Sequence, residues 1–370
     1  MSERDRAFMR RALDLAGRAR GLTSPNPMVG AVVVGDDEIV GEGFHRAAGQ
    51  PHAEPEALAA AGARARGATL YVTLEPCVHQ GRTPPCVPAI VAAGVRRVVV
   101  GLGDPNPRVA GRGLAELRAA RIEVVAGVLE EEAARQNRAF LVAMHAGRPH
   151  VTLKGAITLD GRIADVEGVS QWITGEAARA YAHRLRSESD AIVAGIETVL
   201  KDDPRLDVRL GAPWPREPYR VVVDSLARTP VNAQLVTIGT AARAVVAVSD
   251  RAPRERVDAL TARGVTVVPC PGADGRVDPG RLLGWLAERE VRAVLVEGGG
   301  EVHASFLDAG LVDRVAVFVA PMLLGGRAAT SLVGGAGRRL KESVRLGPFE
   351  VTPLGADVLL EADVARTTGG

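Results

Sequence analysis

One imidazole, two thiols and one carboxylate occur along the chain with the spacing of a hydrolytic zinc site. His52 is followed two residues later by Glu54, and Cys77 and Cys86 come next. Zinc prefers tetrahedral nitrogen and sulfur ligands, and a catalytic zinc keeps its fourth position for water. Because His52, Cys77 and Cys86 supply three ligands, that position would stay open. Glu54 would then lie close enough to carry protons to and from the bound water.

This set of residues is close to a signature of zinc-dependent deaminases, His-x-Glu followed by Pro-Cys-x-x-Cys. The chain differs in one respect, since eight residues separate its two cysteines. The expected chemistry is attack of an activated water on a ring carbon that carries an amino group, with Glu54 as general base and then acid. Two alternatives stay open: a closed structural zinc with His45 or His79 as fourth ligand, or no metal. An ordinary loop position is the simpler interpretation of His79.

Asn26 lies between two prolines, which restrict its backbone. Its side-chain amide offers a donor and an acceptor that suit the edge of a ring. A simple Asx turn explains the same pattern.

Two segments of the second half have compositions that suit ligand contacts. The glycine-rich segment 296–301 ends an expected strand and begins an expected helix, where backbone N–H groups can approach a phosphate. It does not match the G-x-G-x-x-G fingerprint, and a plain turn remains an alternative. The segment 202–209 mixes acids and arginines around a proline, which also suits a solvated loop. Arg186, on an expected helix, would by default be a surface charge.

Hydrophobic periodicity predicts alternating helices and strands in both halves. In the first half we expect helices at 5–20, 54–64, 86–93, 111–120 and 130–144, and strands at 29–35, 36–43, 68–75, 96–101 and 122–126. In the second half we expect strands at 150–154, 191–194, 219–223, 244–248, 265–268, 293–296 and 314–319, and helices at 176–187, 253–263, 279–290 and 301–309. This alternation is typical of an α/β/α sandwich followed by an α/β domain with a mostly parallel sheet, joined by a polar linker at 145–150.

Composition narrows the possible classes of function. At 370 residues two domains are expected, and a net charge of +2 with 3% aromatic residues disfavours nucleic-acid binding. The longest apolar run, 315–324, is too short to span a bilayer, and the charged N-terminus lacks the apolar region of a secretion signal. Three cysteines, two of them expected ligands, favour a reducing cytoplasm. Cys270, between two prolines, is expected to be structurally inert.

Four motifs of the first half resemble one known family. They are Pro-Asn-Pro-Met-Val-Gly at 25–30, His-Ala-Glu at 52–54, the segment 73–86 that holds both cysteines, and Asp-Pro-Asn-Pro-Arg-Val-Ala-Gly-Arg-Gly at 104–113. They look like the deaminase half of the bifunctional riboflavin-biosynthesis deaminase–reductases, in which the cysteines have the same wide spacing. The segments 153–162, 170–174, 202–209 and 296–300 resemble the reductase half, so the resemblance covers nearly the whole chain.

The resemblance implies a cytidine-deaminase-like α/β/α sandwich at 1–147 and a dihydrofolate-reductase-like α/β domain at 148–370. The first domain would use Zn²⁺ to hydrolyse the 2-amino group of 2,5-diamino-6-ribosylamino-4(3H)-pyrimidinone 5′-phosphate. The second would use NADPH to reduce the ribosyl group to ribityl, which gives 5-amino-6-ribitylamino-uracil 5′-phosphate.

The same resemblance assigns roles to residues. It implies His52, Cys77 and Cys86 as zinc ligands and Glu54 as the proton shuttle. It implies NADPH contacts at Ala156, Trp172, Thr198, Asp202, Ser225, Gly299, Gly300, Glu301, Val302, His303, Ala304 and Ser305. It implies substrate contacts at Asn26, Ser170, Arg186, Leu206, Arg209 and Glu297. Two arginines could hold a phosphate monoester, Trp172 could cover an apolar cofactor face, and Lys154 is a further candidate for the same pocket.

Three hypotheses follow from the sequence. The favoured one is a two-domain cytoplasmic enzyme that acts on a small pyrimidine ribotide, without nucleic-acid or membrane partners, as a homo-oligomer (dimer or tetramer). The second is a nucleoside or tRNA deaminase with an inert appendage, and the third is a non-enzymatic module with a structural zinc and a nucleotide sensor.

Overall fold

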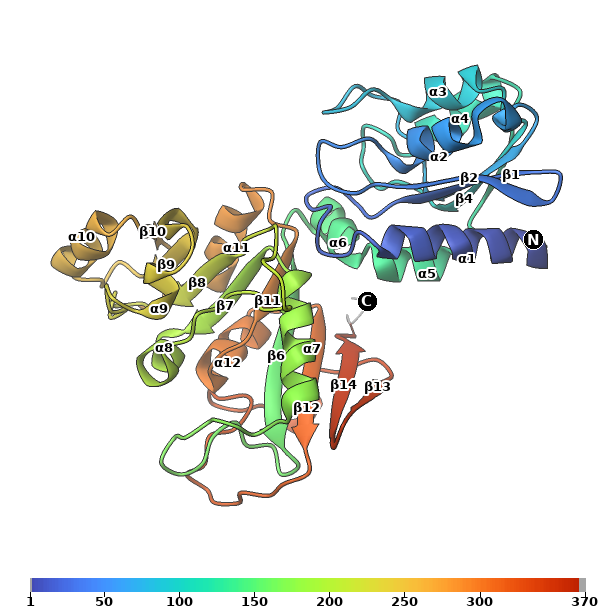
Figure 1. Ribbon diagram of the computed structural model, residues 1–370. Helices are drawn as coiled ribbons and strands as arrows, with labels where there is room; N and C mark the ends of the chain where they lie inside the picture. The colour runs from blue at the N-terminus through green and yellow to red at the C-terminus, as the bar shows by residue number, and fades with distance from the viewer. Residues whose placement is uncertain (1, 366–370) are drawn as a thin grey trace. The chain divides into compact units, whose positions relative to one another are not determined.

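The computed structural model describes residues 2–365, and the chain divides into two compact units, Met1–Gly147 and Arg148–Gly370 (Figure 1). The division falls between the end of helix α6 (Arg138–Ala146) and the start of strand β6 (His150–Thr158). Within residues 2–365 no helix is both long enough and apolar enough to cross a membrane.

The first unit is built on a five-stranded mixed sheet with the strand order β2-β1-β3-β4-β5. Strand β1 is antiparallel to β2 and β3, whereas β3, β4 and β5 are parallel to one another. The strands are β1 (Gly30–Gly35), β2 (Glu38–Phe44), β3 (Thr69–Leu74), β4 (Arg97–Leu102) and β5 (Glu123–Ala126). Parallel strands share one carboxyl edge, so the segments that follow β3 and β4 emerge on the same side of the sheet.

Helices cover both faces of this sheet (Figure 1). Val32 packs with α1 (Glu3–Gly17) and α5 (Glu130–Gln136) on one face, and its neighbour Val33 packs with the other helices on the opposite face, because side chains alternate along a strand. The helices of that second face are α2 (Ala53–Ala61), α3 (Cys86–Ala92) and α4 (Arg112–Ala119). The three-layer sandwich expected from the sequence is therefore present.

Two glycines of β2 let helix α2 lie directly on the sheet. A Cβ atom at Gly41 would come within 2.2 Å of the Ala57 carbonyl oxygen, and one at Gly43 within 2.5 Å of the Ala53 carbonyl oxygen. Any larger residue would push the helix away from the strand. This close approach determines where the first turn of α2 lies, and that turn carries Glu54.

The prediction of one continuous helix at 130–144 is wrong, because Asn137 divides the segment into α5 and α6. The Asn137 side chain accepts a hydrogen bond from the Met28 backbone N–H (2.8 Å) and donates one to the Met28 carbonyl (2.9 Å). The amide thus pairs with the backbone just before β1. Periodicity does not reveal such a contact between distant residues.

The second unit is built on a nine-stranded sheet with the order β10-β9-β8-β7-β11-β6-β12-β14-β13. Strands β6 to β12 are parallel, and β13 and β14 form an antiparallel hairpin beside β12. Besides β6, the strands are β7 (Ala191–Gly195), β8 (Tyr219–Val223), β9 (Ala244–Val248), β10 (Thr266–Pro269), β11 (Ala293–Val296), β12 (Arg314–Ala320), β13 (Glu350–Leu354) and β14 (Asp357–Asp363). The mostly parallel sheet is confirmed.

The helices of the second unit also form layers around its sheet. Val193 packs with α11 (Pro279–Ala287) and α12 (Gly300–Asp308), and the neighbouring Ile192 packs with the helices of the opposite face. Those are α8 (Ile196–Asp202), α9 (Gln234–Thr237) and α10 (Arg254–Ala262). Helix α7 (Glu176–Ser187) packs against β12 and β14.

The sequence analysis did not identify the β13–β14 hairpin or the short helices α8 and α9. Strand β13 is an edge strand without a buried residue and has a proline at 353, so it lacks the alternation of buried and exposed positions that predicts a strand. Helices α8 and α9 are too short for a periodic signal to emerge.

Candidate active sites

The first site lies at the carboxyl edge of β3, where three elements bring the expected metal ligands together. His52 is the residue just before the first turn of α2, Cys77 follows β3, and Cys86 is the first residue of α3. The His52 Nδ1 atom lies 3.6 Å from the Cys77 sulfur and 3.3 Å from the Cys86 sulfur. Within residues 2–365 these three side chains are the one His/Cys/Asp/Glu group with ligand atoms all within 4.8 Å of each other.

Backbone hydrogen bonds close the loop between the two cysteines. The N–H groups of Cys86 and Val87 donate to the Cys77 carbonyl at 3.0 and 3.2 Å. The wide spacing of the cysteines is therefore accommodated by a loop whose ends meet, so both sulfurs face the same point.

The two sulfurs lie close enough to shift each other's pKa. Hydrogen bonds from Cys86 and His52 lower the pKa of Cys77 to about 4, although burial acts against this. The hydrogen bond to that sulfur, together with burial, raises the pKa of Cys86. Two sulfurs and one imidazole are the ligands that Zn²⁺ prefers, so the residues fit the metal.

Neighbouring side chains hold the imidazole rings in place. The His52 Nε2 atom lies 3.0 Å from the Thr83 hydroxyl, which leaves Nδ1 to face the sulfurs. His45 hydrogen-bonds the Pro51 carbonyl through Nδ1 and the Asn26 amide through Nε2, each at 3.0 Å. Both nitrogens of His45 are thus engaged, which argues against His45 as a fourth ligand. Asn26 is thereby held by His45, whose ring centre lies 5.3 Å from that of His52. Its expected contact with the pyrimidine stays a prediction.

Glu54 lies in the first turn of α2, two residues after His52, and is 3% exposed. Burial raises the pKa of its carboxyl group. A carboxyl group whose pKa is raised holds a proton more readily than an exposed one, which suits a proton shuttle.

Two residues that the sequence analysis did not single out support this site. The Glu75 carboxylate accepts hydrogen bonds from the N–H groups of Asp104 (3.2 Å), Gly111 (3.0 Å) and Leu114 (3.2 Å), so it ties the segment after β4 to the segment that carries Cys77. Thr83 is the other. Both lie inside the quoted family motif 73–86, but only the fold shows what they contact.

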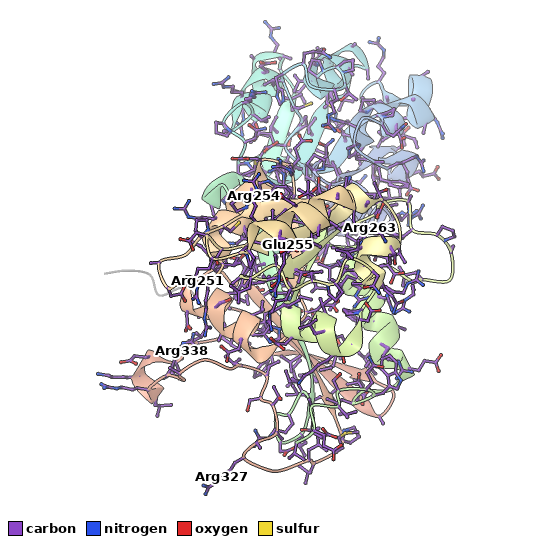
Figure 2. The ribbon with its side chains drawn as sticks, turned by 90° about the vertical axis from the view of Figure 1, so that its left-hand side faces the viewer. Arg251, Arg254, Glu255, Arg263, Arg327 and Arg338 are labelled. Atoms are coloured by element: carbon purple, nitrogen blue, oxygen red, sulfur yellow. The ribbon has the colours of Figure 1, made fainter. Side chains whose placement is uncertain are left out.

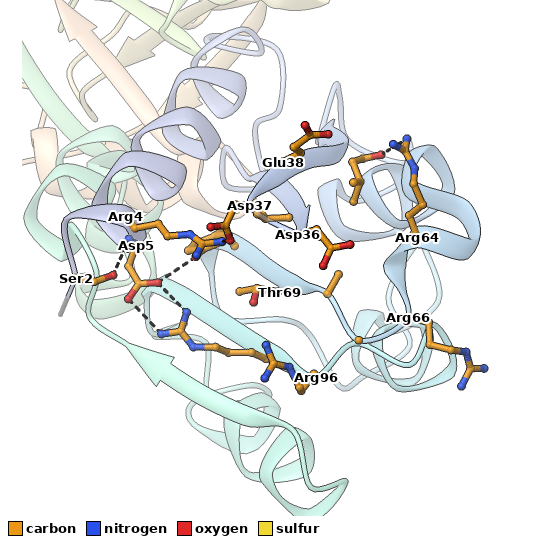
Figure 3. Close-up of a pocket in the computed structure, with 17 residues that line it drawn as sticks. Ser2, Arg4, Asp5, Asp36, Asp37, Glu38, Arg64, Arg66, Thr69 and Arg96 are labelled. Atoms are coloured by element: carbon orange, nitrogen blue, oxygen red, sulfur yellow. Dashed lines mark hydrogen bonds and ion pairs between the residues drawn. The ribbon is translucent and has the colours of Figure 1, made fainter.

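A cavity of about 690 Å³ lies at the opposite, amino edge of the same strands (Figure 3). Thr69 and Arg97, the first residues of β3 and β4, line it. None of the metal ligands contributes to it. Much of its charge is already matched, because Arg97 pairs with Asp5 at 2.7 Å and Arg4 pairs with Asp37. The expected deaminase residues therefore lie at the His52 edge, away from this cavity.

The second site lies at the carboxyl edge of the parallel sheet in the second unit. A Cβ atom at Gly298 would come within 3.0 Å of the Thr198 hydroxyl, and one at Gly300 within 2.9 Å of the Ser331 carbonyl oxygen. The turn between β11 and α12 is thus tightly enclosed, and Gly299 adopts a φ of +77°. Its backbone N–H groups at the start of a nine-residue helix suit an anionic cofactor group.

Arg186 and Glu297 form a two-point ion pair, with both nitrogen–oxygen distances 2.7 Å. Arg186 also donates to the Asp207 carbonyl at 3.0 Å. The expectation of a surface charge at Arg186 is wrong, because its side chain is only 14% exposed. Burial lowers the pKa of Lys154, although the charge of Glu297 opposes this effect. The resulting cluster brings together Arg186, Glu297 and the candidate Lys154.

Some of the remaining expected residues are at least partly exposed to solvent, and others are buried in the core. The Ser170 hydroxyl donates to the Asp202 carboxylate at 3.2 Å, and the Arg179 guanidinium lies 4.6 Å from the ring centre of Trp172, which is 66% exposed. Arg209 is exposed, Ala156 lies on β6, Ser225 follows β8, and Glu301 lies in the first turn of α12. Trp172, Ser225 and the start of α12 all follow the carboxyl ends of parallel strands.

Several expected contact residues have side chains that point into the core. These are Leu206, Val302, His303 and Ala304, and the Ser305 hydroxyl donates to the Val302 carbonyl. The side chains of Leu206, Val302 and Ala304 offer no polar atom, so polar contacts with a ligand would come from their backbone. The His303 ring hydrogen-bonds the Leu332 carbonyl through Nδ1 at 2.8 Å, and its buried Nε2 has no hydrogen-bond partner within residues 2–365. Arg186 is held in a largely buried two-point ion pair with Glu297, whereas Arg209 faces Asp207 at 3.4 Å and its side chain is 57% exposed. Arg209 is therefore the better placed of the two arginines for a phosphate group.

Comparisons with known proteins support both halves. Residues 149–360 match the family model "RibD C-terminal domain", and residues 2–102 match "Cytidine and deoxycytidylate deaminase zinc-binding region". The chain is 43% identical to riboflavin biosynthesis protein RibD of Aquifex aeolicus over 97% of this chain and 98% of that protein. It is 43% identical to the Escherichia coli RibD, with 96% and 98% covered.

Solved structures agree with this match over nearly the full length. Acinetobacter baumannii RibD (form 1) superimposes with a TM-score of 0.88 at 40% identity, covering 98% of this chain and 99% of that chain. A deaminase/reductase from Thermotoga maritima gives a TM-score of 0.83 at 35% identity, covering 98% and 99%. With a zinc-type His/Cys/Cys group in one unit and a reductase fold in the other, the chain belongs to the RibD family of bifunctional deaminase–reductases of riboflavin biosynthesis.

Proposed function

We propose that the unit 1–147 hydrolyses the 2-amino group of 2,5-diamino-6-ribosylamino-4(3H)-pyrimidinone 5′-phosphate. The unit 148–370 then reduces the ribosyl group to ribityl with NADPH. The Thermotoga maritima relative carries the matching printed name, diaminohydroxyphosphoribosylaminopyrimidine deaminase and 5-amino-6-(5-phosphoribosylamino)uracil reductase. The single observation that carries the proposal is the convergence of His52, Cys77 and Cys86 beside a buried Glu54.

In the deaminase unit, bound zinc would supply an activated water. Glu54 would take one proton from the attacking water and give it to the ring nitrogen. It would then take a second proton from the hydroxyl group added to the ring carbon and give it to the amino group, which leaves as ammonia. Asn26 contacts the pyrimidine, and its amide is oriented by the bond to His45. Thr83 keeps the His52 ring turned toward the sulfurs.

In the reductase unit, the NADPH contacts are Ala156, Trp172, Thr198, Asp202, Ser225 and the segment 299–305. The substrate contacts are Ser170, Arg186, Leu206, Arg209 and Glu297, with Leu206 acting through its backbone. The hydrogen bond between Ser170 and Asp202 supports adjacent substrate and cofactor contacts. NADPH supplies the hydride, and the protein's part is to align the ribosyl C1′ with it.

The test is to supply the diamino substrate with and without NADPH and follow product masses. Without NADPH, the deaminated ribosyl compound, identified by its mass, should accumulate together with free ammonia. With NADPH, the ribityl compound should replace it. If NADPH is consumed on the diamino compound before any ammonia appears, the proposed order is wrong.

We further propose that the enzyme is cytoplasmic and works as a homo-oligomer. Thiolate ligands require cysteines that stay reduced, which favours a reducing compartment. Light scattering on the zinc-loaded protein tests the assembly, and a monomer at micromolar concentration would contradict it.

A further inference from the structure

NADPH and NADH differ by one phosphate group on the adenosine ribose, so an enzyme that prefers NADPH needs a cation for that group. Ligands of open parallel sheets bind at the carboxyl edge. Ser225, a proposed cofactor contact, follows β8 at this edge, and Arg251 follows β9, the next strand in the sheet. Any cation for the extra phosphate should lie near Ser225.

Hydrogen bonds lock the segments after β8 and β9 together. The Ser249 hydroxyl donates to the Ser225 carbonyl at 2.8 Å and accepts from the Arg251 N–H at 3.2 Å. The Ser225 hydroxyl accepts from the Val277 N–H at 3.1 Å, which leaves its own proton available to a ligand. Arg251 and Ser225 are therefore held by one shared network.

The Arg251 side chain rests on a glycine that leaves room for it. A Cβ atom at Gly275 would come within 2.7 Å of the Arg251 Cδ atom and 3.0 Å of its Nη1 atom. Gly275 and Val277 belong to the same turn before α11, so this turn contacts both Arg251 and the Ser225 hydroxyl. The turn fixes the direction of the long arginine side chain.

Among residues 2–365, the Arg251 guanidinium has no ion-pair partner, although carboxylates lie in the neighbouring turn. Those carboxylates are engaged elsewhere, since Asp274 faces Arg276 at 3.9 Å and Asp278 caps α11 through the N–H of Gly280 at 2.7 Å. Arg276 itself is matched by Glu301 at 3.3 Å. Arg251 thus has an exposed guanidinium without an ion pair, and its backbone belongs to the same hydrogen-bonded network as the Ser225 hydroxyl. Such a combination suits a phosphate monoester.

We propose that Arg251, with the Ser225 hydroxyl, binds the 2′-phosphate of NADPH and gives the reductase its preference for NADPH over NADH. This inference rests on the proposed reductase function. Arg251 is a specificity residue and not a catalytic one, because hydride transfer occurs at the opposite end of the cofactor.

The test compares Arg251→Leu with a matched control, Arg263→Leu. Arg251 precedes the first residue of α10 by three positions, whereas Arg263 is the C-cap of α10, and Figure 2 shows the two arginines well apart. Because α10 connects the parallel strands β9 and β10, it runs from the carboxyl edge of the sheet back to its amino edge. With the deaminated substrate and the zinc-loaded full-length enzyme, Arg251→Leu should lower kcat/KM for NADPH roughly 10- to 100-fold through KM. The value for NADH should stay within about twofold. Arg251→Lys should restore part of the loss, and Arg263→Leu should match the wild type.

A binding measurement separates this inference from activity. Calorimetry with 2′,5′-ADP and with 5′-AMP should show tighter binding of 2′,5′-ADP to the wild type, and similar binding of both to Arg251→Leu. Equal losses for NADPH and NADH, or an unchanged ratio, would overturn the inference while leaving the reductase function intact. A wild type that oxidises neither cofactor would instead overturn the proposed function.

Discussion

Arg186 and Glu297 lie 111 residues apart in the chain, yet the Nε and Nη2 atoms of Arg186 each contact the Glu297 carboxylate at 2.7 Å. Arg186 comes from the last turn of α7, and Glu297 follows β11. The pair is largely withdrawn from water. It therefore links a helix to the ligand edge of the sheet at the point where the substrate contacts are proposed.

Replacing Glu297 by Gln should destabilise the second unit. The change leaves a buried guanidinium without its counter-charge, which typically costs about 3–5 kcal/mol. All three tryptophans lie in this unit, so urea unfolding followed by tryptophan fluorescence of the full-length protein measures the effect. The exposed Glu255 on α10 (Figure 2) provides a control, and Glu255→Gln should change stability by less than about 0.5 kcal/mol.

Glu297→Gln should also make the free energy of unfolding depend less on pH in acid. Burial acts to raise the pKa of Glu297, but the charges of Arg186 and Lys154 outweigh it and lower that pKa to about 2. A lowered folded-state pKa gives stability that is present above the unfolded value and is lost as the pH falls through the folded value. Wild-type stability should therefore decline between about pH 4.5 and 2 more steeply than that of Glu297→Gln. Parallel curves would contradict the assignment.

His183 should contribute to pH dependence in a higher range. Burial and the charges of Arg186 and Arg209 lower its pKa to about 4, against weaker opposing effects of Glu297 and Asp207, and its Nδ1 accepts from the Arg209 N–H at 3.2 Å. An unfolded histidine takes up its proton near pH 6.5, so the unfolded state binds more protons between about 6.5 and 4. Stability should fall as the pH falls through this window.

His183→Gln should flatten the curve between these pH values, because Gln can still accept the hydrogen bond but does not titrate. The urea midpoint measured at intervals across the window checks this. His145→Gln, an exposed position in the first unit, should retain the wild-type slope.

Replacing Glu54 by Gln should stop deamination while zinc stays bound. Loss of a general acid–base typically lowers the rate about 10²- to 10⁴-fold. Ammonia release gives the rate, and metal analysis gives the zinc content. Reduction of the deaminated substrate should be unchanged, since that chemistry belongs to the other unit. A protein with a purely structural zinc would show no effect.

Glu56→Gln is the matched control for Glu54. It lies in the same first turn of α2, but its carboxylate faces Arg46 at 3.3 Å and the Phe44 N–H at 3.4 Å. Deamination by this variant should remain within a few fold of the wild type. A loss as large as that of Glu54→Gln would show that the helix, and not the shuttle, was damaged.

Thr83→Val should weaken zinc binding roughly 10- to 100-fold, because residues that hydrogen-bond a metal-bound histidine typically contribute that much affinity. The hydroxyl 3.0 Å from His52 Nε2 is lost, and the ring is no longer held toward the sulfurs. Competition with a chelator measures the affinity. Thr83→Ser keeps the hydroxyl and should bind zinc like the wild type, so equal weakening in both variants would argue against the hydrogen bond.

Much of the deaminase site could be predicted from the sequence. His52, Glu54, Cys77 and Cys86 were identifiable because their side chains carry distinctive chemistry at a spacing that is known from one family. The alternation of strands and helices was likewise readable, because periodicity is a local property of the chain. The ends of individual helices and strands were harder to predict. The helix expected at 130–144, for example, is divided at Asn137.

The tertiary structure alone decided which distant residues meet. The bond from Thr83 to His52, the three N–H groups gathered by Glu75, and the burial of Arg186 against Glu297 depend on which strands are neighbours in the sheet. The same is true of Arg251, whose side chain lies over a glycine from another segment. Residue type and local period determine what a side chain can do and which element carries it, whereas its partners are set by long-range packing, which leaves no local trace in the sequence.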